Sequence, residues 1–118
     1  IMGLVAESTE ARQLLDWADS GEAFCVSSIA WYEFLCGPIS AEQCAAMKLL
    51  VSEIVDFDED LAAKAADLFN QVGRRRQLRV DAMIAATAIA RDVPLATRNV
   101  TDFAHFEGVG LQLMVASG

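Results

Sequence analysis

The stretch VDAMIAATAIARDVPLATRNVTDF, residues 80–103, decides the fold of this chain. Its first part, Val80–Ala90, predicts a helix that is apolar nearly all round, and such a helix is normally buried. Val93–Thr97 follows closely and predicts a strand, introduced by Pro94, which is tolerated where a strand starts. A buried helix leading into a buried strand is typical of an α/β protein with a parallel sheet.

The same alternation continues toward both ends of the chain. Upstream and downstream, the periodicity and the capping residues predict further helices and strands separated by short connections. The predicted helices are Glu7–Ala18, Ile29–Cys36 capped by Ser27 or Ser28, one opened by Ser40 and one capped by Asp58; the predicted strands are Phe24–Val26, Ile54–Phe57 and Leu111–Val115. In a parallel sheet of this kind, sites form beyond the C-terminal ends of the strands.

The composition describes a globular chain of one domain. It has 118 residues, of which 54% are hydrophobic and 22% are charged, and this balance excludes a disordered chain. No apolar run approaches the roughly 20 residues of a membrane-spanning helix, and no segment resembles a signal peptide. The three cysteines, Cys25, Cys36 and Cys44, include no CxxC pair. We therefore expect buried, reduced thiols in a cytoplasmic protein with no membrane partner.

The charge of the chain gives two conflicting indications. A net charge of −8 argues against nucleic-acid binding, because phosphate affinity comes from Lys and Arg. However, Arg74, Arg75, Arg76 and Arg79 lie within six positions, and a divalent cation can invert the local field of a carboxylate cluster. The arginines could contact phosphate, or they could complement the dipole at a helix end. The sequence leaves both interpretations open.

Three acids lie in apolar surroundings, unlike most of the 17 acids of the chain. Glu33 is on the first turns of a helix that follows a strand, Asp81 starts a helix, and Asp102 follows the end of a strand. These places gather along one edge of a parallel sheet, and converging carboxylates need a cation such as Mg²⁺ or Mn²⁺. Alternatively, Asp81 and Asp102 are helix N-caps, and Glu33 is a snorkelling or salt-bridged residue that faces solvent.

Thr97-Arg98-Asn99 comes between the last predicted strand and Asp102. Thr97 and Asn99 could orient an acid or a metal-bound water, and Arg98 could meet a phosphate as a planar fork. The same residues are also typical of a turn.

Two parts of the sequence resemble PIN-domain proteins, and the VapC-type toxins of bacterial toxin–antitoxin pairs in particular. Val80–Ala88 followed by Pro94–Phe103 is similar to the C-terminal half of that family, and Val26–Phe34 with Gly37 is similar to its second acidic motif. The resemblance implies a three-layer α/β/α sandwich with a short central parallel sheet. It also implies a Mg²⁺- or Mn²⁺-dependent endoribonuclease, the toxin of a toxin–antitoxin system.

The resemblance further implies roles and partners. Glu33 corresponds to the second acid, Asp81 to the third, and Asp102 or Asn99 to the last acidic position. Glu33, Asp81 and Asp102 would bind the metal, and Thr97 and Arg98 would contact the substrate. The implied partners are an RNA substrate, a cognate antitoxin that blocks the groove, and a second copy of the chain in a homodimer.

One departure from the family affects the N-terminus. The family begins with a short apolar strand that ends in Asp, whereas Ile1–Leu4 resembles the residues just after that motif. We therefore expect residues 1–118 to be a single, N-terminally incomplete PIN-like domain that is a processed or trimmed product, without its first, central strand and one acid. The alternative function is a non-catalytic PIN-like interaction module or an inactive fragment, which the acidic composition favours.

Overall fold

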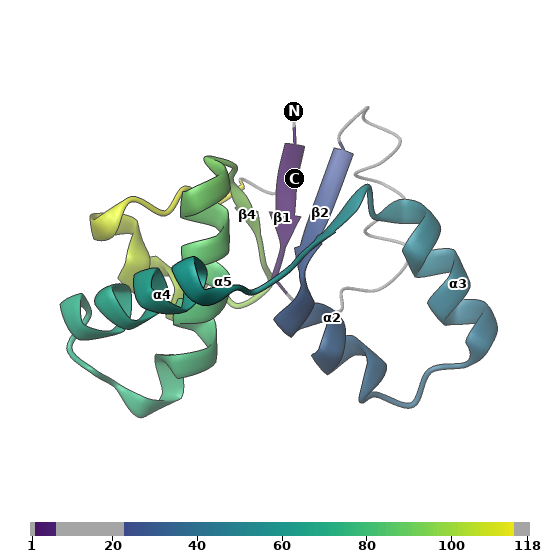
Figure 1. Cartoon of the computed structure of the whole chain (residues 1–118), viewed down its shortest axis with the longest axis horizontal. Helices are drawn as coiled ribbons and strands as arrows, with labels where there is room; N and C mark the ends of the chain where they lie inside the picture. Colours follow the sequence, from purple (N-terminus) through teal and green to yellow (C-terminus); the bar gives the residue numbers. More distant parts are fainter. Residues whose placement is uncertain (1, 7–22, 115–118) are drawn as a thin grey trace.

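A computed structural model describes residues 2–6 and 23–114 and shows an α/β fold built on a parallel sheet (Figure 1). The four strands are paired in the order β3-β2-β1-β4, and every pair is parallel. The strands are β1 (Met2–Val5), β2 (Ala23–Ser27), β3 (Glu53–Val55) and β4 (Leu95–Ala96). The helices are α2 (Ser28–Leu35), α3 (Ala41–Leu50), α4 (Glu59–Gln71), η1 (Arg76–Leu78), α5 (Arg79–Arg91), α6 (Val100–Phe103) and η2 (Ala104–Val109).

The expectation that the sheet lacks its central strand is wrong. Met2–Val5 lies between β2 and β4, with Leu4 opposite Cys25 on one side and Leu95 on the other. A central parallel strand is buried on both faces, so a short apolar run is sufficient to form it. Gly3 suits this strand because a Cβ there would come within 2.7 Å of the sulfur of Met114. A four-residue apolar run therefore occupies the middle of the sheet.

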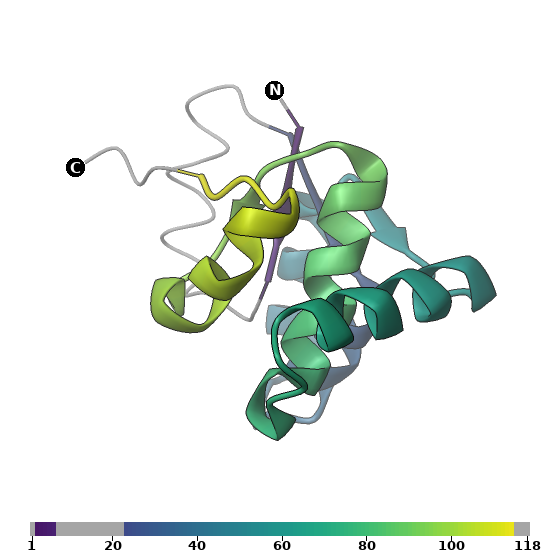
Figure 2. The same cartoon turned by 90° about the vertical axis from the view of Figure 1, so that its left-hand side faces the viewer.

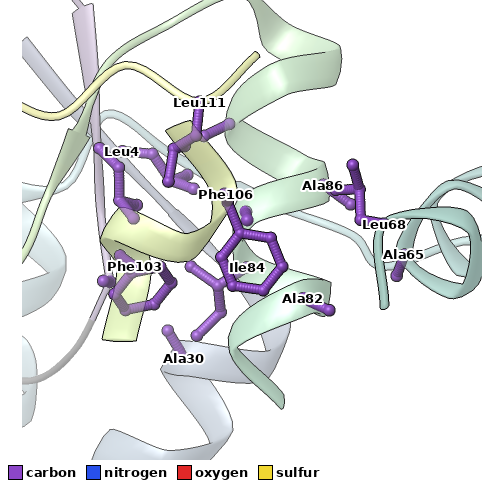
Figure 3. Packing of buried hydrophobic residues seen from close by; sticks show 14 of the residues in the cluster. Leu4, Ala30, Ala65, Leu68, Ala82, Ile84, Ala86, Phe103, Phe106 and Leu111 are labelled. Carbon is purple, nitrogen blue, oxygen red and sulfur yellow. The ribbon is translucent and has the colours of Figure 1, made fainter. Parts of the chain in front are cut away.

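The two faces of the sheet carry two separate apolar clusters. Successive residues of a strand point to opposite faces: Leu4 packs into the larger cluster, while Val5 packs with Phe24 and Met47 in the smaller one. The larger cluster contains residues of α4, α5, α6 and η2 (Figure 3). In Figure 1, α4 and α5 lie on one side of the strands and α3 on the other. The expected three-layer α/β/α arrangement is thus confirmed.

Helix α5 is the most deeply buried helix of the described chain. Six of its thirteen residues are buried, among them Ala85, Ala86 and Ala88, whose relative exposure is 0%. The hydroxyl of the buried Thr87 is satisfied because it donates to the carbonyl of Met83 at 2.9 Å. Figure 2 shows α4 crossing α5, and the two helices pack against each other. The prediction of a buried helix at Val80–Ala90 is confirmed.

The predicted helix starts are confirmed by their hydrogen bonds. Ser27 caps α2 and accepts from the backbone N–H of Ala30 at 3.0 Å. Ser40 and Gln43 form a reciprocal capping box at the start of α3. Asp58 caps α4, since its Oδ1 accepts from the N–H of Leu61 at 2.9 Å. Side chains of this type satisfy the first free N–H groups of a helix and so fix where it begins.

The first predicted helix and the last predicted strand lie near the two ends of the chain. The predicted helix Glu7–Ala18 lies outside the described residues. The predicted last strand at Leu111–Val115 is wrong as far as it is described, because Leu113 makes only an isolated parallel bridge to Leu95. The N–H of Leu95 donates to the carbonyl of Gln112 and its carbonyl accepts from Met114, both at 2.8 Å. The two-residue strand β4 offers no room for a longer ladder.

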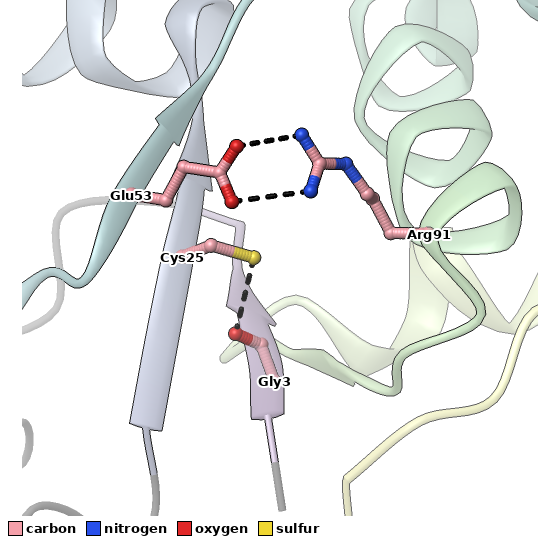
Figure 4. A network of polar contacts seen from close by, with 4 residues as sticks. All are labelled: Gly3, Cys25, Glu53 and Arg91. Carbon is pink, nitrogen blue, oxygen red and sulfur yellow. Dashed lines mark hydrogen bonds and ion pairs between the residues drawn. The ribbon is translucent and has the colours of Figure 1, made fainter.

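The three free thiols differ in exposure. Cys25 is buried, Cys44 is half-buried and Cys36 is exposed, so the expectation of buried thiols is wrong for Cys36. The reason is position, since Cys36 is the C-cap of the short helix α2 and lies past Ala30, the buried residue of that helix. Burial, followed by the nearby carboxylate of Glu53, raises the pKa of the Cys25 thiol. That thiol faces the carbonyl of Gly3, 3.5 Å from Sγ to O (Figure 4).

An ion pair joins the C-terminal end of α5 to the edge strand β3. Nη1 and Nη2 of Arg91 donate to Oε1 and Oε2 of Glu53 at 3.1 and 2.6 Å (Figure 4). This two-bonded geometry is the preferred one for an arginine and a carboxylate. The Glu53 carboxylate holds the pKa of Arg91 above its ordinary value.

No helix of the described chain is long and apolar enough to cross a bilayer.

Candidate active site

A pocket of about 570 Å³ lies beyond the C-terminal ends of β1, β2 and β4. Its lining comes from four separate parts of the chain: the residue after β1, helix α2 after β2, the first turns of α5, and the segment after β4. The lining residues are Ala6, Glu33, Val80, Asp81, Ile84, Arg98, Asn99 and Phe103. This is the edge of a parallel sheet where α/β proteins place their sites.

Glu33 reaches the pocket from α2 and is exposed. The start of α2 is fixed by the cap at Ser27, and the hydroxyl of Ser28 accepts from the N–H of Phe57 at 3.0 Å. The helix is therefore tied to the segment after β3 as well as to β2. Glu33 therefore faces solvent, as the alternative interpretation expected, and it does so at the pocket.

Asp81 is the third residue of α5 and is half-buried. The N-cap of α5 is Leu78, so the alternative that Asp81 caps this helix is wrong. A carboxylate in the first turn is nevertheless favoured by the positive end of the helix dipole. Packing of α5 against the sheet thus holds Asp81 at the pocket, on the same lining as Glu33.

Asn99 and Asp102 form one small hydrogen-bonded unit. Asn99 is the N-cap of α6, and its Oδ1 accepts from the N–H of Asp102 at 3.4 Å. Its Nδ2 donates to Oδ2 of Asp102 at 2.9 Å, while Oγ1 of Thr97 accepts from the N–H of Asn99, also at 2.9 Å. The alternative that Asp102 is a cap is therefore wrong, because Asn99 takes that role.

The pocket therefore gathers part of the predicted set. Glu33, Asp81, Arg98 and Asn99 line it, whereas Asp102 is held against Asn99 and does not belong to the lining. In residues 2–6 and 23–114, no group of three His, Cys, Asp or Glu side chains could hold a metal ion.

The residue that follows β1 at the pocket is Ala6, which carries no ligand atom in its side chain. The remaining oxygen donors are two carboxylates and the amide of Asn99. Mg²⁺ is commonly bound by one or two carboxylates and keeps several waters, so this donor set fits a hydrated divalent ion.

Sequence reasoning missed one exposed residue beside the site. Helical apolar patterns contain Trp17, Trp31 and Tyr32, and they predict that all three are core residues. Trp31 is partly buried against the core. Tyr32, however, is 58% exposed. Its position next to Glu33 was no signal of this exposure, because consecutive residues of a helix do not share a face. Trp17 lies outside the described residues.

Comparisons with known proteins identify the family. Similar solved structures include VapBC-1 from nontypeable Haemophilus influenzae, at 17% identity over 97% of each chain with a TM-score of 0.71, and FitAcB from Neisseria gonorrhoeae, at 19% identity over 97% of each chain with a TM-score of 0.67. A toxin–antitoxin complex from Klebsiella pneumoniae is similar at 24% identity over 86% of this chain and 90% of that chain, with a TM-score of 0.60. A separate comparison with curated proteins finds no match. The PIN domain family model matches residues 1–109, and the chain belongs to the PIN-domain family.

Proposed function

We propose that this chain is a metal-dependent endoribonuclease and the toxin of a toxin–antitoxin pair. The observation that carries the proposal is the lining of one pocket by Glu33 and Asp81, which come from distant parts of the sequence, together with Arg98. The pocket lies at the strand ends of a PIN domain. This combination supplies carboxylates for a cation and a guanidinium for a phosphate.

In this proposal Glu33 and Asp81 hold the Mg²⁺ or Mn²⁺ ion. When bound, such an ion lowers the pKa of a water and neutralises charge on a phosphoryl group. Arg98 contributes planar donors that match two phosphate oxygens. Asn99 donates to Oδ2 of Asp102 at 2.9 Å, and Asp102 does not belong to the pocket lining, so in this proposal Asp102 acts through Asn99 or through water.

The charge of the chain makes the cation indispensable to this proposal. With a net charge of −8 and two carboxylates at the pocket, an RNA phosphate is repelled unless the local field is inverted. A bound divalent ion does this, because it is the largest local charge in such a site. We therefore expect RNA binding at this pocket to depend on the divalent ion as strongly as cleavage does.

The partner proposed for this site is an antitoxin protein that covers it. One similar solved structure is described as a toxin–antitoxin complex, and the open pocket of this chain offers a surface for such a partner. We also propose a cytoplasmic location, which the exposed and free Cys36 favours, because exposed thiols persist in reducing compartments.

The test is cleavage of a single-stranded RNA by the purified chain, with Mg²⁺, with Mn²⁺ and with a chelator. We expect cleavage with metal that disappears in Asp81→Asn, while Asp60→Asn, an exposed acid of α4, cleaves like the original chain. In parallel, Mn²⁺ should raise the unfolding temperature of the chain and not that of Asp81→Asn. Cleavage by Asp81→Asn at the original rate would refute the proposal.

A non-catalytic binding module is the second candidate. Ala6 at the pocket and the absence of a three-acid cluster among the described residues favour it. If Mn²⁺ neither stabilises the chain nor supports cleavage, this second candidate replaces the first.

A further inference from the structure

Two further hollows adjoin the candidate active site and form a continuous strip with it. Glu33 and Val80 line both the candidate site and a hollow of about 300 Å³. Met83 lines that hollow and also a groove of about 600 Å³ along α4 and α5. Because neighbouring hollows share lining residues, the strip leads from the two carboxylates through the hollow into the groove.

The first turn of α5 contributes one residue of a different kind to each part of the strip. Asp81 lines the candidate site, Val80 the hollow and Arg79 the groove. Consecutive residues of a helix point in different directions, so each of the three reaches a hollow of its own. The strip therefore changes from acidic to apolar to basic within one helical turn.

The hollow in the middle offers an exposed aromatic ring on an apolar surface. Tyr32 and Val80 line it and are 58% and 42% exposed, and Ile29 and Met83 complete its apolar part. A side-chain hydrogen bond with Cys36, one turn farther along α2, raises the pKa of the Tyr32 hydroxyl. An exposed ring of this kind is a surface on which single-stranded nucleic acids stack a base.

The groove supplies cations that no acid neutralises. Arg74, Arg76 and Arg79 line it and are exposed. Arg74 donates to Oδ1 of Asn70 at 2.7 Å. Among the residues that the structure describes, no acid lies at ion-pair distance from Arg76 or Arg79. A chain of net charge −8 thus leaves these two cations to an external anion.

The helix dipole, one of the two interpretations of the arginine cluster, does not explain Arg79. Arg79 is the first residue of α5, and the positive end of the helix dipole disfavours a cation there. Gly73 and Arg74 have positive φ, 96° and 58°, and turn the chain after α4, while the fully buried Leu78 anchors the segment. The backbone therefore holds Arg79 at the groove although the helix gains nothing from its charge.

We propose that the strip binds one side of a single-stranded RNA whose scissile phosphate lies at the candidate active site, with the adjoining base stacked on Tyr32 and the next phosphates at Arg76 and Arg79. A strand that leaves the candidate site presents a base and then further phosphates. The strip offers an aromatic ring and then arginines in the same order. The inference rests on the proposed function, which places the scissile phosphate beside Glu33 and Asp81.

This arrangement restricts the substrate class to RNA with an unpaired nucleotide beside the scissile bond. In a duplex the bases are paired and stacked on one another, whereas those of loops and single strands can stack on aromatic side chains. The apolar lining of the hollow offers little that could read the hydrogen-bonding edge of a base. We therefore expect no single required base, and a preference for purines because their larger rings stack over more area.

An acidic protein segment fits the strip less well than RNA does. Such a segment would suit the arginines, but a run of acids has no planar ring for Tyr32. Every nucleotide carries both a planar ring and an anion, so RNA matches the hollow and the groove together.

The first experiment measures binding of a labelled, single-stranded oligoadenylate by fluorescence anisotropy, in an Asp81→Asn background without divalent ions. We expect Tyr32→Ala to weaken the affinity roughly 10-fold and Tyr32→Phe to retain it. Leu49→Ala is the matched control, because Leu49 is 87% exposed on α3 and lies off the strip. Circular dichroism confirms that each variant folds. No binding by the background variant, or unchanged binding in Tyr32→Ala, overturns the proposal.

The second experiment tests the phosphate contacts through salt. Arg76→Gln with Arg79→Gln should reduce the slope of log affinity against log salt by about 1.4, since each phosphate contact on a single strand contributes about 0.7. Lys48→Gln with Lys64→Gln is the control of equal net charge, because neither lysine lines the strip. An equal reduction in both double variants would mean that only net charge matters, and this overturns the phosphate path.

The third experiment locates the base directly. An oligonucleotide that carries the photoreactive base 5-iodouracil is irradiated on the same background variant, and the cross-linked residue is identified by mass spectrometry. We expect a cross-link to Tyr32 with the single strand and none with the duplex. Equal cross-linking of the duplex, or a cross-link elsewhere only, overturns the stacked position.

Binding is measured without cleavage, so the inference and the proposed function can fail separately. If the original chain cleaves RNA with Mn²⁺ but the Tyr32 and arginine variants bind RNA like their controls, the nuclease stands and the strip is overturned. If these variants lose RNA binding but the original chain does not cleave, the strip is an RNA site and the nuclease is removed. If the double arginine variant loses binding of a polyglutamate peptide and not of RNA, the groove takes an acidic protein segment, which also overturns the proposal.

Discussion

Two acidic hollows of this molecule contrast in what their acids contact. The hollow at the edge strand β3, about 370 Å³ in volume, contains four acids: Glu53, Asp56, Asp58 and Asp60. The candidate active site contains only Glu33 and Asp81. The number of carboxylates would therefore favour the hollow at β3 as the functional site. The surroundings of the carboxylates favour the pocket at Glu33 and Asp81.

The acids at β3 already have structural roles. Glu53 is paired with Arg91, Asp58 caps α4, and Asp60 lies in the first turn of α4, where the helix dipole favours it. The pocket at Glu33 and Asp81 instead includes Arg98 and Asn99 from the end of another strand. The lesson is that a site is identified by the convergence of different chemical groups, and not by the density of acids.

The largest expected effect is on the rate of RNA cleavage, and it distinguishes the two hollows. Glu33→Gln should lower the rate of RNA cleavage by roughly 100-fold or more, because removal of one electrostatic group at a reacting centre has that magnitude. Asp56→Asn, an exposed acid of the β3 hollow, should leave the rate unchanged. The rates are measured per folded molecule at saturating Mn²⁺. Equal losses in the two variants would remove the distinction between the hollows.

An effect of intermediate size is expected on the stability of the fold when the cap of α4 is removed. Asp58→Ala removes the acceptor for the N–H of Leu61 and should destabilise the fold by about 1 kcal/mol. The unfolding temperature should fall by roughly 4 °C, while cleavage below that temperature is unchanged. Asp67→Ala is the control, because Asp67 is exposed farther along α4. If Asp58→Ala abolished cleavage in the folded state, the β3 hollow would have a functional role after all.

The smallest effect on the unfolding temperature is expected from loss of the ion pair between Glu53 and Arg91. Glu53→Gln should lower the unfolding temperature by less than Asp58→Ala does, since both side chains of the pair are partly exposed, at 44% and 43%. The difference from the original chain should shrink at high salt. An arginine is charged throughout the neutral and mildly alkaline range and Glu53 raises the pKa of Arg91 further, so the attraction persists across that range. A double-mutant cycle with Arg91→Gln measures the pair, and a salt-independent effect would contradict this account.

The sequence predicts local features of the fold well because their causes are local. Ser27, Ser40 and Asp58 act within one helical turn, so their capping roles can be inferred from spacing alone. The burial of α5 follows from its own apolar composition. The strand Met2–Val5 was not predicted, because its evidence is not local: four apolar residues form a strand only through partners in β2 and β4.

The same distinction applies to the candidate site. Topology alone brings Glu33 and Asp81 to one pocket, because the positions of both residues follow from the order of the strands and helices. The separation of Asp102 from the lining depends on the cap made by Asn99, a choice within one turn that sequence spacing cannot resolve. The exposure of Tyr32 depends on what α2 leaves uncovered, which requires the packed structure.

The two edges of the sheet have a consequence for aggregation. A bare edge strand offers free N–H and C=O groups to which a strand of another molecule can add. Here β3 is only three residues long and begins with the paired Glu53, while the isolated bridge at Leu113 covers part of β4. Addition of a foreign strand is disfavoured at both edges. The chain should therefore resist the growth of intermolecular β-structure.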